Sequence, residues 1–255
     1  MIKFTVTTPE YPVLTGLVIL SFAAIHILGS RLEMARSTPR RIWLSAAGGI
    51  SIAYVFVHIL PELAHHQKAF DRGGPFGLLD GSERHVYFMA LLGLVCFYGL
   101  ELAVRASESR QEAASGVRQV STPIFWLQLV SYALYNLIIG YLLLDREETG
   151  LVNLATYAIA MGLHFVVNDQ GLREQSHPGY DKVGRWVLAF AAVAGWSLAL
   201  TVDLPPVAIA GLFAFLAGGV ILNVLKYELP ADRQSDFRAF VLGAAAYAAV
   251  LLAAP

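Results

Sequence analysis

The sequence predicts an all-α integral membrane protein with eight transmembrane helices, and three observations support this fold class. The chain of 255 residues is 56% hydrophobic and only 15% charged, whereas soluble domains carry about 25% charged residues. Its apolar residues fall into segments of roughly 20 residues, the length that an α-helix needs to cross a bilayer. Shorter polar connections, which hold the Lys and Arg residues, separate these segments.

The apolar segments follow one another along the whole chain, so we predict a single membrane domain over residues 1–255. Pro123 opens the fourth segment, a position that suits proline because the first N–H groups of a helix have no partner within it. Pro205 and Pro206 separate the sixth segment from the seventh. The predicted spans are approximately residues 11–30, 43–63, 85–104, 123–144, 150–169, 185–203, 206–226 and 237–254.

The positions of the Lys and Arg residues predict the orientation of the chain in the membrane. If the N-terminus lies outside, thirteen of these residues fall on the inner connections and five on the outer parts of the chain. Cytoplasmic connections of membrane proteins carry an excess of Lys and Arg. We therefore expect both termini outside, in a multi-pass protein of the cell membrane (the cytoplasmic membrane, if the source is bacterial).

Two pairs of similar segments predict an internal repeat. Ala-Gly-Gly occurs in the second and seventh spans, each of which ends in Leu-Pro, and a Leu-Gly step occurs in the third and eighth. The positions are 47–49 and 217–219, 60–61 and 229–230, and 92–93 and 242–243. Because the second and seventh spans cross in opposite directions, we predict an inverted repeat of three helices on each side of a central pair, a 3+2+3 plan. Such repeats are typical of transporters; the alternative is that Ala-Gly-Gly merely allows close helix packing.

The fifth span carries a polar stripe within an otherwise apolar run. Tyr157, Met161, His164 and Asn168 are spaced to lie on one face of a helix. Asp169 follows about 100° further round the helix. Ionisable residues inside a span are costly and indicate a functional site. We take Met161, His164, Asn168 and Asp169 as candidate metal ligands; the alternative is that they form hydrogen bonds between helices.

A second group of candidate ligands lies near the outer end of the second span. His58 and Glu62 are one helical turn apart, and His65 and His66 follow directly. Together these side chains could gather cations at an outer mouth, or they could simply be solvated at a helix end. Pro61 is expected to bend or end the helix between them.

At this point the chain resembles the ZIP (Zrt/Irt-like) family of metal transporters. The resemblance covers nearly the whole chain and rests on the 3+2+3 plan, on the second span with its ending His58-Ile-Leu-Pro-Glu62, and on the similar seventh and eighth spans. It implies transport of a divalent metal cation such as zinc, with ligands mostly on the fourth and fifth helices. It implies neither an enzyme nor a resident cofactor.

The chain departs from the family pattern where the ligands are expected. The fourth span, over residues 131–140, has no histidine and no carboxylate. The fifth span keeps His164, but Val167 stands where the family has proline, and Asn168 where it has a carboxylate. The resemblance therefore implies a carrier with a depleted metal site. The alternative is a ZIP-fold membrane protein that does not transport and has a structural or regulatory role.

The fourth span has a polar stripe of its own, made by Gln128, Tyr132, Tyr135 and Asn136. It faces either a shared polar interior or hydrogen-bond partners on neighbouring helices. His26, in the middle of the first span, is expected to be a packed histidine that shares a hydrogen bond with a neighbouring helix.

Other classes of function have little support. A hydrolase within the membrane would need clustered nucleophile and base residues, and no Gly-x-Ser-x-Gly motif is present. A net charge of -1 gives no case for nucleic acid as a partner. The expected partners are the lipid bilayer and a divalent metal ion; a homodimer is among the assemblies left open.

Overall fold

The computed structural model describes residues 11–29, 40–71, 84–144, 150–174, 178–225 and 236–253. Within these ranges the chain forms eight helices and no β-strand, and each helix lies at a predicted apolar segment. The prediction of an all-α protein is confirmed. The Leu229-Pro230 ending of the predicted repeat lies outside the described residues.

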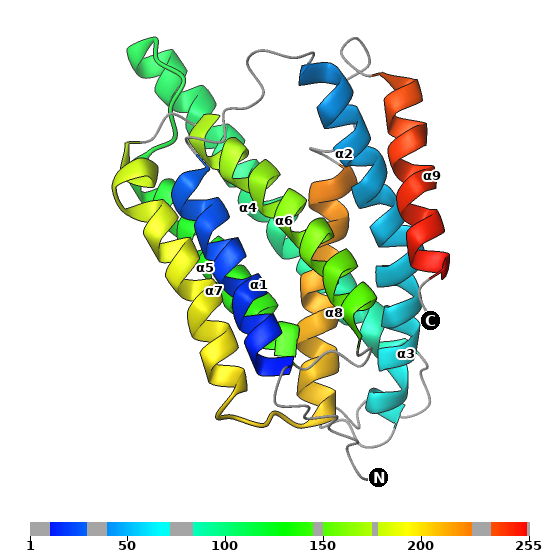
Figure 1. The fold of residues 1–255 in the computed structure, drawn as a ribbon. Helices are drawn as coiled ribbons and strands as arrows, with labels where there is room; N and C mark the ends of the chain where they lie inside the picture. The colour runs from blue at the N-terminus through cyan, green and yellow to red at the C-terminus, as the bar shows by residue number, and fades with distance from the viewer. Residues whose placement is uncertain are drawn as a thin grey trace.

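Consecutive helices run in alternating directions through one bundle (Figure 1). Three of them contain π-helical residues: η1, Val55–Ile59, joins α2 to α3, η3, Tyr180–Gly184, leads into α7, and residues 224 and 225 follow α8. The predicted second, fourth and fifth spans therefore correspond to α2–α3, α5 and α6. The α-helices are α1 Tyr11–Leu28, α2 Arg40–Tyr54, α3 Leu60–Asp71, α4 His85–Ser115, α5 Thr122–Leu144, α6 Leu151–Glu174, α7 Arg185–Ala199, α8 Pro206–Asn223 and α9 Phe237–Ala253.

Among the residues that the structure describes, five helical segments are long and apolar enough to cross a membrane. They are Ser45–Lys68, His85–Ser115, Thr122–Leu144, Leu151–Arg173 and Pro206–Asn223. Two further apolar helices, Pro12–Leu28 and Phe237–Ala253, are shorter. At a rise of about 1.5 Å per residue, a helix of 17 residues reaches about 25 Å, less than a hydrocarbon core of about 30 Å. The structure thus supports a membrane protein, and five of the eight predicted spans meet the length and hydropathy of a spanning helix.

Glycines bring α2 against α9 and α4 against α8 at the distance of backbone contact. A Cβ atom on Gly49 would collide with the carbonyl group of Phe240, and one on Gly243 with the carbonyl group of Ala46. Small residues at such crossings let helix backbones approach closely in membranes. The Ala-Gly-Gly motif therefore has a packing role, as one of the two sequence interpretations expects.

The contact between α4 and α8 has the same register. A Cβ atom on Gly218 would collide with the carbonyl group of Ala90, and one on Gly93 with the carbonyl group of Phe215. The two helix pairs therefore share one pattern. On each helix, the carbonyl group that faces the partner's glycine belongs to the residue three positions before that helix's own glycine. The same register occurs where α5 meets α7, with Gly140 at the carbonyl group of Ala192 and Gly195 at that of Leu137.

Candidate functional site

The second helix does not end at Pro61. It continues as α3 to Asp71, and the irregular part is the π-helical turn η1 just before the proline. There the N–H of Leu60 donates to the carbonyl oxygen of Val55, five residues earlier. A wider turn at this point accommodates a proline, which cannot donate to the preceding turn. Single π-helical turns are frequent at functional sites, and this one holds His58.

A cavity of about 60 Å³ lies beside this turn, between α3, α6 and α8. Its polar walls come from His58, Glu62 and His66 on the second helix and from Tyr157 on α6, with the sulfur-bearing Met161 beside them. Apolar residues close the rest: Ile59, Leu142, Ile209, Phe213, Leu216, Ala217 and Val220, with the ring of Tyr54. We call this space the outer cavity, because we predict that this end of the helix bundle lies at the outer face of the membrane.

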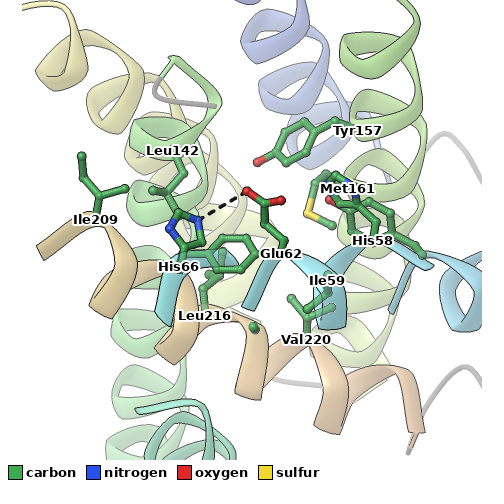
Figure 2. A pocket seen from close by; sticks show the side chains of 13 residues that line it. His58, Ile59, Glu62, His66, Leu142, Tyr157, Met161, Ile209, Leu216 and Val220 are labelled. Carbon is green, nitrogen blue, oxygen red and sulfur yellow. Dashed lines mark ion pairs between the residues drawn. The ribbon is translucent and has the colours of Figure 1, made fainter. Parts of the chain in front are cut away.

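The carboxylate of Glu62 lies at the centre of the outer cavity, with His66 on one side and His58 and Met161 on the other (Figure 2). His66 Nε2 is 3.6 Å from Glu62 Oε1. The His58 ring stacks on Tyr54, with 5.0 Å between the ring centroids. Two imidazoles, a carboxylate and a thioether thus meet in a cavity whose other walls are largely apolar.

Three of the predicted ligands, His58, Glu62 and Met161, therefore line one cavity. The sequence places His66 in the group that could gather cations at an outer mouth but not among the six candidate ligands. Its position was informative, because residues 58, 62 and 66 recur every four residues and so follow one helix face. His66 is buried, with 8% of its surface exposed, rather than solvated at a helix end.

His164 and Asn168 do not line the outer cavity. The amide nitrogen of Asn168 lies 3.0 Å from His164 Nε2, and the hydroxyl of Tyr135 on α5 lies 2.8 Å from the same atom. An amide N–H₂ can only donate, so Nε2 is the acceptor of these bonds. All three side chains are buried. Nε2 of His164 is thus already engaged with two neighbours, so metal binding at this nitrogen would require both to move.

Asp169 faces a third helix, as its position on α6 requires. Its two carboxylate oxygens lie 2.9 and 3.0 Å from Nδ1 of His26 on α1. The amide nitrogen of Asn136 on α5 lies 2.9 Å from the other ring nitrogen, Nε2. The prediction that His26 shares a hydrogen bond with a neighbouring helix is confirmed. This network joins three helices, and the exposed fraction of each of its side chains is 2% or less.

The structure thus divides the six predicted ligands between the outer cavity and two hydrogen-bonded networks. Across the part of the chain that the structure describes, no three His, Cys, Asp or Glu side chains are placed to hold a metal ion as they stand. Binding a cation in the outer cavity would require His58, Glu62 and His66 to draw together.

An aromatic contact lies next to the Tyr135–His164 pair. The rings of Phe97 on α4 and Tyr135 meet edge to face, with 5.5 Å between their centroids. Both rings pack on Gly219 of α8, where an added Cβ would lie 2.8 Å from a ring carbon of Phe97 and 3.3 Å from one of Tyr135. We call Phe97, Tyr135 and Gly219 the aromatic barrier.

Comparison of the chain with models of known protein families, with curated proteins and with solved structures gives no match. The function proposed below therefore rests on the geometry of the site and on the resemblance of its motifs.

Proposed function

We propose that the protein is a ZIP-like membrane carrier of a divalent metal cation such as zinc, built on the 3+2+3 plan with both termini outside. The cation enters through the outer cavity. The observation that carries this proposal is the convergence of His58, Glu62, His66 and Met161 on one cavity between three helices. Such groups are costly inside a membrane and usually mark substrate or ion paths.

The chemistry of the outer cavity suits a borderline divalent cation. Zinc is bound by imidazole nitrogen and carboxylate oxygen, usually with four ligands. Glu62 would supply the negative charge, His58 and His66 would supply nitrogen, and Met161 offers a soft sulfur. The long distance of 3.6 Å between Glu62 and His66 leaves this pair weakly coupled. Ligands that must rearrange to bind also let the cation leave, as transport requires.

The helix packing supports the inverted repeat. If the repeat relates α2–α3 to α8 and α4 to α9, the contact between α2 and α9 should correspond to a contact between α8 and α4. Both contacts are present, and their glycines have the same register. If the repeat also relates α1 to α7 and α5 to α6, the contact between α5 and α7 should correspond to a contact between α6 and α1. This contact is also present. The helices related in this way run in opposite directions (Figure 1). The outer cavity lies between α3 and α8, where substrate sites of inverted-repeat transporters are found.

A second candidate function is favoured by one observation. The hydroxyl of Tyr135 and the amide of Asn168 both engage His164, on the two helices where the family resemblance places the metal ligands. Because His164 is engaged in these hydrogen bonds, this arrangement fits a ZIP-fold protein that does not transport and serves a structural or regulatory role.

Metal flux separates the two candidates. The purified protein would be reconstituted into vesicles that contain a zinc-sensitive dye, and zinc would be added outside. We expect zinc influx to fall at least tenfold in Glu62→Gln. It should not fall in the control Glu112→Gln, at the exposed end of α4. Vesicles with wild-type protein that take up no more zinc than empty vesicles would favour the second candidate.

A further inference from the structure

Two arginines lie against the end of α1, at the end of the bundle where α6 finishes and α7 begins (Figure 1). Nη1 of Arg185 is 3.4 Å from the carbonyl oxygen of Ile27. A Cβ atom added to Gly29 would lie 2.8 Å from Nη2 of Arg173 and 3.4 Å from its Nη1. Because residues 27 and 29 are neighbours on one turn, the two guanidinium groups lie close together. We call Arg173 and Arg185 the arginine pair.

Most donors on the buried side of the arginine pair have no acceptor. Nε and Nη2 of Arg173 and Nε of Arg185 are buried and have no hydrogen-bond partner among the described residues. Capping of α1 engages only Nη1 of Arg185, through a long bond to Ile27. A buried donor without an acceptor is unfavourable, and more so when it carries charge. These donors therefore indicate an anionic ligand.

The neighbouring carboxylates do not supply the missing acceptor. Asp181 lies 3.7 Å from Nε of Arg173, too far for a hydrogen bond, and its side chain is largely exposed, so that water screens the pair. Asp169, one helical turn before Arg173, accepts from His26 instead. Lys182 is exposed on the same segment and adds positive charge. Guanidinium groups bind phosphate through two parallel N–H bonds, so the arginine pair suits a phosphate group.

A ligand can reach the arginine pair from the surface of the bundle. The side chain of Arg173 is 22% exposed, and Arg185 is half-buried. Cζ of Arg173 lies 5.3 Å from the ring centroid of Tyr180, and Cζ of Arg185 lies 5.6 Å from that of Trp186. Rotation about the terminal bonds of these two side chains brings the unpartnered donors to a ligand at this surface.

The surface next to the arginine pair is apolar. Val183, Trp186 and Phe190 are exposed, and their spacing places them on one side of η3 and α7. Exposed tryptophan is enriched at the level of the lipid headgroups, and the guanidinium group of Arg185 lies over this ring. A ligand with both a phosphate group and hydrocarbon chains fits the two surfaces together, whereas a free phosphate ion would use only the arginine pair.

We propose that the arginine pair binds the phosphate group of an anionic phospholipid, whose acyl chains lie along Val183, Trp186 and Phe190. The predicted topology places this end of the bundle at the inner face of the membrane. Anionic lipids give the cytoplasmic leaflet a negative surface, and basic pockets between helices on this side bind their headgroups. The site lies at the ends of α1, α6 and α7 and does not depend on the proposed carrier function.

The test measures how phosphatidylglycerol with brominated acyl chains quenches the tryptophan fluorescence of the purified full-length protein in detergent. Bromine quenches nearby indole rings, so a lipid bound beside Trp186 lowers the emission. Brominated phosphatidylcholine, which has no net charge, is the reference lipid. We expect phosphatidylglycerol to quench at a lower concentration than phosphatidylcholine, and we expect this advantage to be lost in Trp186→Phe.

The arginine pair is tested by combining Arg173→Gln with Arg185→Gln, which should weaken phosphatidylglycerol binding by at least about tenfold. The control combines Arg105→Gln with Arg118→Gln. It removes the same charge from two exposed arginines that form ion pairs with Glu101 and Glu108, and it should leave binding unchanged.

Three results would overturn the proposal. The first is binding by the Arg173→Gln, Arg185→Gln variant that equals that of the wild type, or an equal loss in the control. The second is an advantage of phosphatidylglycerol that persists in Trp186→Phe; this comparison decides alone if the double variant fails to fold. The third is inorganic phosphate that raises the unfolding temperature through the arginine pair where phosphatidylglycerol does not, which would make the ligand a soluble phosphate.

Discussion

His26 and Asp169 join α1 to α6 through a pair of short contacts, with Nδ1 of the imidazole 2.9 Å from one carboxylate oxygen and 3.0 Å from the other. The amide of Asn136 extends the contact to α5. This buried ionisable pair does not line the outer cavity. Its role is to fix the position of α6, which carries Met161 into the outer cavity and His164 against the aromatic barrier.

Replacing Asp169 by asparagine should destabilise the bundle. The substitution removes the charge that accepts from His26, and a hydrogen bond to a charged group contributes about 1.5–3 kcal/mol. Thermal unfolding of the detergent-solubilised protein measures the change. The control is Asp181→Asn, whose carboxylate is 66% exposed and 3.7 Å from Arg173; exposed pairs contribute about 0–1 kcal/mol. Equal losses in the two variants would contradict the structural role assigned to Asp169.

Alanine in place of Gly218 should destabilise the protein, whereas alanine in place of Gly99 should not. A Cβ on Gly218 meets the backbone of α4, but one on Gly99 meets nothing within 4 Å. At an open helical position alanine is favoured over glycine by roughly 0.5–1 kcal/mol. Unfolding temperatures of the two variants give the comparison. Gly49→Ala should match Gly218→Ala, because the two glycines have equivalent contacts; a clear difference between them would argue against the repeat.

Tyr135→Phe should weaken the aromatic barrier but keep an aromatic ring at position 135. The ring stays, but the donor to His164 Nε2 is lost, at a cost of about 1 kcal/mol for a hydrogen bond between membrane helices. Under the carrier account, zinc flux through reconstituted protein should rise, because Phe97 and the ring at position 135 then part more easily. Tyr98→Phe, at a ring that is 49% exposed, serves as the control. Unchanged flux in Tyr135→Phe, in a protein that transports, would show that this pair is no barrier.

The orientation in the membrane can be tested with single cysteines after Cys96→Ser. Ser109→Cys, near the end of α4, should react with a membrane-impermeant thiol reagent from the cytoplasmic side. Thr201→Cys, between α7 and α8, should react from outside; both positions are exposed. Labelling of both from one side would contradict the predicted topology.

The sequence predicts the helices well because each apolar segment must form its own backbone hydrogen bonds in lipid. Prolines mark two helix starts correctly: α5 begins at Thr122, next to Pro123, and α8 begins at Pro206. Pro61 does not end the helix, one of the two outcomes expected of it, because the π-helical turn before it accommodates the missing hydrogen bond and the helix continues to Asp71. That compensation depends on the backbone of the preceding turn, which residue type alone does not specify.

The candidate site is less predictable because it depends on which helices face one another. Spacing on α6 correctly separates Asp169 from His164 and Asn168, yet it does not reveal that Asp169 meets His26. Gln128 on α5 and Asn223 on α8 line one small cavity, which periodicity within one helix cannot show. The spacing of His58, Glu62 and His66 did hold usable information, since the three share a helix face.

If a divalent cation crosses the membrane through the outer cavity, zinc uptake should differ between vesicles that contain wild-type protein and vesicles that contain His66→Gln. His66 is buried beside Glu62 in the outer cavity, so glutamine keeps much of its volume but removes a zinc ligand. We predict saturable uptake by the wild type and a reduction of about tenfold in the variant, a change of about 1.4 kcal/mol. Equal uptake by the two proteins, or no uptake above that of protein-free vesicles, would contradict it.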